Sequence, residues 1–306
     1  MEMPNVDPFT IAKKDRLIAR LLQVLPDDAV IHEPEETRAY ECDALTAYKC
    51  PPLAVVLPRT TDEVAAVLKI CHDMEIPVVP RGSGTSLAGG ALPTADSVIL
   101  GVARMTDVLE VDYDDRIIRL QTGRTNLSVT GAVEADGFFY APDPSSQLAC
   151  AIAGNIGMNS GGAHCLKYGV TTNNLLGVVT EATLRILPKP EGARPVLMAF
   201  DDNETAGACV ADIIKAGVLP VAIEFMDRPV IRATEAFAHA GYPDAEALLI
   251  VEVEGSEDEI DEQLEVIEKI ARTHNPVELR RSTSSDESAR IWLGRKSAFG
   301  AMGQIN

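Results

Sequence analysis

The feature that most limits the fold of this chain is a glycine-rich loop, PRGSGTSLAGG, at residues 80–90. It follows a short apolar run at residues 76–79 that is typical of a β-strand. Glycine permits positive φ angles and lets backbone amides approach a ligand without an intervening Cβ atom. Successive amides on such a loop form a concave anion site, and Ser83, Thr85 and Ser86 add hydroxyl donors. The loop therefore predicts a site for a phosphate or pyrophosphate, with an ordinary surface loop as the alternative.

The spacing within the loop excludes two common nucleotide-binding motifs. It contains no Gly-Lys-Ser/Thr sequence, so it is not a P-loop. Leu87 stands where a dinucleotide fingerprint requires its third glycine. A second stretch rich in Gly, Ser and Asn spans residues 141–162. We expect the two stretches to clamp one extended ligand between them.

Length and composition narrow the class of protein. The 306 residues are enough for about two domains, and a net charge of −19 disfavours binding to nucleic acid or anionic membrane surfaces. The sequence starts without a signal-peptide pattern, and no apolar run has the length of a membrane span. The 6 cysteines show no metal-binding spacing and indicate reduced thiols in a cytoplasmic protein. The 5 histidines are scattered, so no metal site is expected.

Hydrophobic spacing and capping residues predict an α+β domain with short strands in the first part of the chain. The expected strands are residues 53–57, 76–79, 98–100, 108–111, 117–121 and 182–187. The expected helices are residues 11–24, a helix capped by Thr60 and Glu63, and residues 127–135. Leu22 and Leu68 are expected on the buried faces of the first two helices.

A different pattern follows a linker at residues 188–192. Strands and helices alternate, at residues 196–200, 204–216, 221–226, 229–239, 247–253, 257–272 and 277–279. This order predicts a ferredoxin-like arrangement of split βαβ units, with helices on one face of an antiparallel sheet. A last helix is expected to begin near Ser285 and to carry Trp292 and Arg295.

Several long motifs, in this order, resemble the FAD-linked 2-hydroxy-acid dehydrogenases, the family of the FAD-linked subunit of glycolate oxidase and of D-lactate-type dehydrogenases. The motifs are YECD (40–43), PRGSGTSLAGG (80–90), APDPSSQLAC (141–150), NSGGAHCLKYGVTTNNLLG (159–177), VTEATLRILPKPEGARP (179–195), AIEFMD (222–227) and IWLGRKSAFGAMG (291–303). The resemblance implies an α+β fold: an N-terminal helical segment (1–48), a two-subdomain FAD-binding domain of the PCMH type, related to vanillyl-alcohol oxidase (49–190), and a ferredoxin-like α/β cap domain (191–306).

The resemblance also implies the site residues. The cofactor would be FAD, with its pyrophosphate held by backbone amides of the first loop. The residues implied in FAD binding are Arg81, Gly82, Ser83, Gly84, Thr85, Ser86, Pro142, Ser145, Ser146, Gly154, Asn159, Ser160, Gly162 and Val179. Thr85 stands where some relatives carry a histidine for covalent flavin attachment, so we expect non-covalent FAD.

Other residues of these motifs carry separate expectations. Arg295 would bind the substrate carboxylate, because a guanidinium offers it a planar fork; pairing with a nearby acid is the alternative. Lys296 is expected in solvent, and Trp292 and His164 in the interior. Cys150 and Cys165 are expected to pack beside the second loop.

The family chemistry is oxidation of a 2-hydroxy acid of the glycolate or D-lactate class to the 2-oxo acid. FAD accepts a hydride from the α-carbon while a base removes the hydroxyl proton. The implied partners are a second FAD subunit and an iron–sulfur subunit, which would bring a cytoplasmic protein to the periphery of the inner membrane. An NADPH-dependent reductase ranks last, because the cap motifs match the hydroxy-acid group.

Two departures from the family pattern lead to an alternative. The family continues from NNLLG through a strand pair and a Gly-Ser-Glu-Gly loop, whereas here Gly177 and Val178 lead directly into VTEAT. A few dozen residues are therefore expected to be absent, and the cap is expected to be incomplete. The HAGDGN-like motif that supplies metal ligands and a base has no counterpart, so the catalytic residue is not assigned. The alternative is a non-catalytic remnant that binds FAD poorly or binds only partner subunits.

Overall fold

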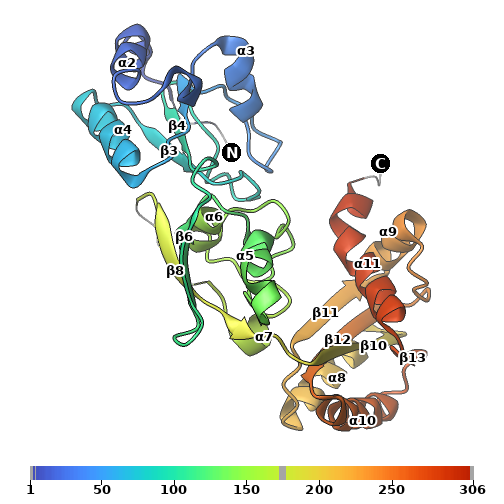
Figure 1. Cartoon of the computed structure of the whole chain (residues 1–306). Coiled ribbons are helices and arrows are strands. Elements are labelled where there is room, and N and C mark those ends of the chain that lie inside the picture. Colours follow the sequence, from blue (N-terminus) through green and yellow to red (C-terminus); the bar gives the residue numbers. More distant parts are fainter. Residues whose placement is uncertain (1–2, 4, 172–176, 304–306) are drawn as a thin grey trace. The chain divides into compact units, whose positions relative to one another are not determined.

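The computed structural model of the chain describes residues 3, 5–171 and 177–303 (Figure 1). Contacts divide the chain into two compact units, one of residues 1–161 and 170–188, the other of residues 162–169 and 189–306. The segment 162–169 thus belongs with the second unit, although its sequence neighbours belong with the first. Residues 173–176, beside the expected junction, lie outside the described residues.

The first unit begins with a four-stranded sheet whose strands β2 and β3 run parallel to β4, while β1 is antiparallel to β2. In spatial order these strands are β1 (Val30–Ile31), β2 (Ala54–Val56), β4 (Val98–Gly101) and β3 (Val78–Arg81). The helices and 3-10 turns around it are α1 (Pro8–Ile11), α2 (Lys14–Leu21), η1 (Asp27–Ala29), α3 (Pro34–Thr37), η2 (Arg38–Tyr40) and α4 (Thr61–Asp73). Helix α2 shares one core with α4, β2 and β4.

Two expected core residues of these helices are instead exposed. Leu22 is 38% exposed, because α2 ends at Leu21 and Leu22 is its C-cap. Leu68 is 36% exposed, because the buried stripe of α4 runs through Val67 and Ile70 and leaves Leu68 at its edge. The predicted cap of α4 is present, since the Thr60 side chain accepts a hydrogen bond from the backbone amide at the third position of the helix.

The rest of the first unit is a three-stranded antiparallel sheet with two short helices beside it. Its strands, in spatial order, are β5 (Val108–Asp112), β6 (Ile117–Gln121) and β8 (Glu181–Arg185). The other elements are α5 (Asn126–Val133), η3 (Glu134–Asp136), α6 (Ile152–Gly157) and the strand pair β7 (Phe138–Phe139) and β9 (Leu187–Pro188). Residues of β6, α5, α6 and β8 share one buried cluster, which fixes α6 next to the sheet.

The second unit contains an antiparallel sheet in the order β11-β12-β10-β13, which is the ferredoxin-like order. The strands are β10 (Gly192–Phe200), β11 (Ala222–Asp227), β12 (Ala247–Gly255) and β13 (Glu278–Arg281). The helices are α7 (Cys165–Tyr168), α8 (Asn203–Lys215), α9 (Arg228–Ala238), α10 (Glu257–Thr273) and α11 (Ser285–Met302). The last helix carries Trp292 and Arg295, as expected.

The expectation that helices cover one face of this sheet is wrong. Helices α8 and α10 pack on one face, against Val196 and Leu249, and α9 and α11 pack on the other, against Leu197 and Ile250 (Figure 1). The reason lies in the central strands, which read VLMAF and ALLIV without alternation. An unbroken apolar run is buried on both faces of its sheet.

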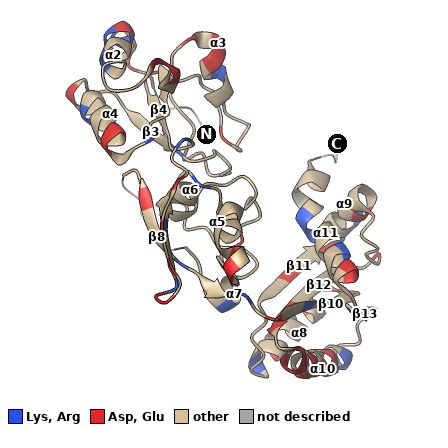
Figure 2. Ribbon diagram, in the orientation of Figure 1, with Lys and Arg blue, Asp and Glu red and all other residues tan. Residues whose placement is uncertain are grey.

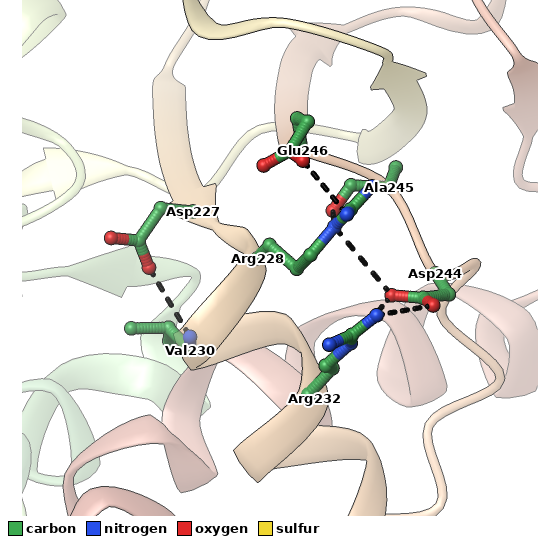
Figure 3. Close-up of polar contacts among 7 residues, drawn as sticks. All are labelled: Asp227, Arg228, Val230, Arg232, Asp244, Ala245 and Glu246. Atoms are coloured by element: carbon green, nitrogen blue, oxygen red, sulfur yellow. Dashed lines mark hydrogen bonds and ion pairs between the residues drawn. The ribbon is translucent and has the colours of Figure 1, made fainter.

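Polar contacts fix the start of α9 to the chain that enters β12 (Figure 3). Asp227 caps the helix by accepting a hydrogen bond from the Val230 amide at 3.2 Å. Arg228 pairs with Glu246 at 2.8 Å, and Arg232 forms a two-point contact with Asp244 at 2.8 Å for each bond. Two arginines on the first turns of α9 thus bind Asp244 and Glu246, two acidic residues of one loop that are separated by a single position.

The acidic charge of the chain gathers most densely on α10 (Figure 2). This helix begins at a capping box in which Ser256 and Glu259 exchange hydrogen bonds. Its first turn is acidic, which suits the positive end of the helix dipole. None of the helices seen in the described residues combines the length and hydrophobicity needed to cross a bilayer.

Candidate functional site

A pocket of about 410 Å³ lies in the first unit, between the two glycine-rich stretches. Residues 80–86 form one wall, and residues of the second stretch, including Ser146, Gly154 and Ser160, form another. Gly177, Val178 and Val179 complete the lining. The two stretches, which are about 70 positions apart in the sequence, therefore line one pocket. That this pocket holds one extended ligand stays a prediction.

The two walls meet at Gly82. A Cβ atom added there would lie 3.3 Å from both the Ala151 Cβ atom and the Gly154 amide nitrogen. Such a contact is closer than an ordinary van der Waals contact, so the neighbouring chain would have to move. Glycine at this position therefore sets the distance between the loop after β3 and helix α6.

The first loop is held in place by contacts between Arg81 and the YECD segment. The Arg81 guanidinium donates to the Cys42 carbonyl oxygen at 2.8 Å and lies 5.6 Å from the centre of the Tyr40 ring. Gly84 has φ +68°, and a Cβ atom there would lie 2.4 Å from the Arg81 Nη2 atom. The Arg81 side chain thus holds the loop in shape, a role that the sequence did not assign to it.

Asn155 supplies a polar group that sequence reasoning missed. It is 2% exposed and lines the pocket. Among the described residues, its Nδ2 atom has no hydrogen-bond partner. Because leaving a buried donor unsatisfied costs about 1–3 kcal/mol, a ligand with an acceptor atom at this point would remove that cost. The pocket therefore suits a ligand that carries both anionic and carbonyl-type oxygens.

The structure brings together most of the predicted FAD-binding residues and separates four of them. The lining contains Arg81, Gly82, Ser83, Gly84, Thr85, Ser86, Ser146, Gly154, Ser160 and Val179. It does not contain Pro142, Ser145 or Asn159. Asn159 has φ +54° and follows the C-cap of α6, so its position meets a backbone requirement. Gly162 belongs with the second unit.

In the second unit, Arg295 pairs with an acid. Its Nε atom donates to the Glu224 Oε2 atom at 2.7 Å, and both side chains are largely buried. One turn earlier on α11, the Trp292 Nε1 atom donates to Glu252 at 2.7 Å. Burial raises the pKa of the Glu252 carboxyl. Helix α11 therefore covers a sheet face that carries the carboxyl groups of Glu224 and Glu252, and Arg295 pairs with the first of them.

The structure also shows the burial of the other residues that the sequence motifs singled out. Lys296 is exposed and Cys150 is buried, as expected, and Trp292 packs partly buried against the core below α11. His164 is only half-buried, and Cys165 is exposed because it starts the short helix α7 at the surface. All the cysteines are free thiols. No cluster of three metal-ligating side chains occurs in residues 3, 5–171 and 177–303.

Comparison with known proteins identifies the family. Residues 52–180 match the family described as FAD binding domain, and residues 189–306 match the C-terminal domain of FAD linked oxidases. The glycolate oxidase subunit GlcD of Escherichia coli K12 is 40% identical, over 99% of this chain and 67% of its own length. This chain belongs to the FAD-linked oxidases. It is an oxidoreductase of that family, and FAD is its cofactor.

Other relatives of this FAD-linked oxidase agree. GlcD of Bacillus subtilis is 33% identical, over 87% of this chain and 65% of its own length. A D-lactate dehydrogenase of Anaerostipes hadrus is 26% identical, over 72% of this chain and 54% of its own length. The chain thus spans about two thirds or less of the length of these relatives. The alignment with the E. coli protein covers 342 positions, although this chain has 306 residues, so at least 36 positions have no counterpart here.

Solved structures confirm the PCMH-type fold. p-Cresol methylhydroxylase superimposes with a TM-score of 0.75 at 14% identity, over 97% of this chain and 72% of its own. Alkyldihydroxyacetonephosphate synthase superimposes with a TM-score of 0.76 at 16% identity, over 99% of this chain and 65% of its own. These likenesses concern the fold alone. The pocket fits the family cofactor, because its glycine loops suit a pyrophosphate and Asn155 offers a buried donor.

Proposed function

We propose that this FAD-linked oxidase oxidises a short 2-hydroxy acid, of the glycolate or D-lactate class, to the 2-oxo acid. The observation that carries the proposal is the pocket in which both glycine-rich stretches converge at Gly82. The substrate class follows from the relatives, which are named as a glycolate oxidase subunit and as D-lactate dehydrogenase. When bound, FAD would accept a hydride from the α-carbon of the substrate.

The residues of the chain have separate tasks in this proposal. Backbone amides of residues 82–86 would hold the pyrophosphate, and the hydroxyls of Ser83, Thr85 and Ser146 would donate to its oxygens. The Asn155 Nδ2 atom would donate to a further cofactor oxygen. Arg295 would bind the substrate carboxylate through its terminal nitrogens. We assign no residue of this chain as the base.

FAD should be bound without a covalent link. Thr85 replaces a histidine used for attachment in some relatives, and the described residues that line the pocket include no His, Cys or Tyr. No lining side chain thus offers an imidazole, thiol or phenol for attachment. Acid precipitation of the purified protein should release all flavin into the supernatant, whereas flavin retained in the pellet would contradict this assignment.

A second candidate is a remnant that binds FAD poorly or binds only partner subunits. It is favoured by the 36 or more alignment positions that have no counterpart here. If these include strands of the flavin domain, buried backbone groups lose partners at a cost of about 1–3 kcal/mol each. A domain has a net stability of only about 5–15 kcal/mol, so the loss of several partners would weaken the FAD site.

One experiment separates the two candidates. The chain is expressed, titrated with FAD while flavin fluorescence is followed, and assayed by dye reduction with glycolate and D-lactate. Stoichiometric FAD binding with turnover supports the enzyme and refutes the remnant. A folded chain that neither retains FAD nor reduces dye supports the remnant and refutes the enzyme.

We also propose that the protein works with partner subunits in the cytoplasm. The E. coli and B. subtilis relatives are both named as subunits, which supports an assembly. The predicted partners are a second FAD subunit and an iron–sulfur subunit, through which the protein would reach the periphery of the inner membrane. Co-expression with those subunits and size-exclusion chromatography test this, and a chain that elutes alone would contradict it.

A further inference from the structure

Glu224 contacts Arg295 on the face of the second unit's sheet that lies below α9 and α11. It lies on β11 opposite Ile250 of β12. Met226, two residues later on β11, points to the same face of the sheet. Its Oε2 atom accepts the hydrogen bond from the Arg295 Nε atom at 2.7 Å. The side chain of Glu224 is 17% exposed and that of Arg295 is 25% exposed. The pair is therefore shielded enough to be ordered, and Arg295 still reaches solvent.

The contact uses only one edge of the guanidinium. A guanidinium has five N–H donors in a rigid plane, and one pair of them lies on the terminal edge, at Nη1 and Nη2. Within the described part of the chain, neither Nη atom of Arg295 donates a hydrogen bond. Because Glu224 engages the Nε atom, the terminal edge remains directed away from it. This edge can bind a carboxylate through two parallel hydrogen bonds.

The backbone that carries Arg295 is fixed independently of Glu224. Trp292, one turn earlier, donates to Glu252 at 2.7 Å. The Tyr242 hydroxyl donates to the Ile291 carbonyl oxygen, and its ring lies so close to α11 that a Cβ atom at Gly294 would be 2.4 Å from it. Helix α11 is thus held on the sheet by other contacts, and Glu224 is left to fix the torsions of the Arg295 side chain.

We propose that Glu224 is a positioning residue, which orients Arg295 so that its terminal edge meets the carboxylate of a 2-hydroxy acid. This rests on the proposed function, because it takes that carboxylate as the ligand of Arg295. The physical basis is preorganisation. A free arginine side chain must lose its rotamer freedom when it binds a ligand, whereas one already held has lost it beforehand.

The negative charge of Glu224 acts in the opposite direction, because it disfavours an approaching anion. Two substitutions separate charge from positioning. Glu224→Gln removes the charge but keeps a carbonyl oxygen that can accept from the Arg295 Nε atom. Glu224→Ala removes both. If Glu224 acts by charge alone, both variants bind an anion more tightly; if it acts by positioning, only the alanine variant binds more weakly.

The test measures the affinity of the chain for oxamate, an unreactive carboxylate that resembles a 2-oxo acid. The chain contains 1 tryptophan, Trp292, so its fluorescence reports on the helix that carries Arg295. We expect Glu224→Gln to bind oxamate within about threefold of the unmodified protein, or more tightly. We expect Glu224→Ala to bind about tenfold more weakly, which corresponds to about 1.4 kcal/mol, since the freed Arg295 side chain must then lose its rotamer freedom on binding.

Asp244→Ala is the matched control. It removes one carboxylate from the same unit, where Asp244 pairs with Arg232 (Figure 3), and it should leave oxamate affinity unchanged. Arg295→Lys should weaken binding at least tenfold, because it removes the fork. A thermal melt of each variant identifies any loss of fold, and rescue by glutamine but not by alanine is a pattern that a general loss of stability would not give.

Three outcomes overturn the proposal: unchanged or tighter binding by Glu224→Ala, equal weakening by Asp244→Ala, or no oxamate binding by the unmodified chain. The measurement is made with and without added FAD, in parallel with flavin titration and dye reduction. If FAD binding and turnover both fail while the oxamate pattern is present, the proposed oxidation is refuted and the role of Glu224 as a carboxylate-site residue remains. If turnover is present and the oxamate pattern is absent, the proposed oxidation stands and the positioning role of Glu224 is refuted.

Discussion

Replacing Gly84 by valine should abolish FAD retention, because this glycine is required for two reasons. Its φ angle of +68° lies in the left-handed region, and a Cβ atom there would lie 2.4 Å from Nη2 and 2.6 Å from Cζ of Arg81. The guanidinium cannot move without breaking its hydrogen bond to the Cys42 carbonyl oxygen and leaving the Tyr40 ring. The substitution thus strains the loop and removes its support together.

The size of the effect follows from these contacts. A non-glycine residue in the left-handed region costs about 1–2 kcal/mol. Loss of the hydrogen bond from the half-buried guanidinium costs about 1 kcal/mol, and loss of the cation–π contact about 0.5–1 kcal/mol. Together these amount to about 3 kcal/mol. The free protein can relieve this strain by letting the loop relax, whereas FAD binding requires the strained conformation. The cost therefore lowers the affinity for FAD, by about 100-fold.

The assay is an FAD titration followed by flavin fluorescence, with a thermal melt to establish that the variant is folded. Gly89→Ala is the matched control. Gly89 also has a positive φ, of +76°, but an added Cβ atom would lie 3.5 Å from Leu45, an ordinary contact, and Gly89 does not line the pocket. It should reduce FAD affinity much less. A folded Gly84→Val protein with normal FAD affinity would refute the assignment of this loop as the phosphate site.

Three further predictions concern stability. Gly294→Ala should lower the melting temperature, because a Cβ atom would lie 2.4 Å from the Tyr242 ring and overpacking by about 1–3 kcal/mol exceeds the helix-propensity gain of about 1 kcal/mol; a raised melting temperature would show that the ring moves freely. Burial raises the pKa of Glu252 above 4.5, so its contribution to stability is full below pH 4.5 and is lost as pH rises through the folded-state pKa. Glu252→Gln should therefore reduce the fall in stability above pH 4.5 in urea melts, and an unchanged pH profile would contradict the assignment. Thr60→Ala should lower the free energy of unfolding by about 1 kcal/mol, because Thr60 caps α4; an unchanged urea midpoint would argue against that cap.

Sequence reasoning succeeded where local signals decide the structure. Strand β6 has the predicted bounds, 117–121, and helix α10 ends within one residue of its prediction. Alternation of apolar and polar residues in a strand, and capping residues at the start of a helix, make such elements predictable from the sequence. The coverage of the second sheet was missed because the antiparallel order of its strands suggested one buried face, whereas the apolar runs in β10 and β12 require two.

The site was predictable in its loops but not in its side chains. Gly82 and Gly84 indicate that the backbone of the loop comes close to a ligand, and the structure places both in the pocket lining. Nothing in the sequence marks Asn155 as a buried donor, since it is one polar residue in a glycine-rich stretch. The Glu224–Arg295 pair was also hidden, because the two residues are separated by 71 positions. Contacts of that range depend on the tertiary fold.

The segment 162–169 has a consequence for the modularity of the protein. The match to the FAD binding domain ends at residue 180 and the match to the oxidase C-terminal domain begins at residue 189. Lys167 and Tyr168 nevertheless bind Glu254 of β12, with the Lys167 Nζ atom 2.9 Å from the carboxylate. A fragment that begins at Lys189 would lack these partners and leave the 7% exposed Glu254 carboxylate without its lysine. Recombination between relatives at the family boundary would likewise combine one parent's lysine and tyrosine with the other parent's carboxylate. Shuffled chimaeras should therefore fold best when residues 162–169 and the C-terminal region are inherited together.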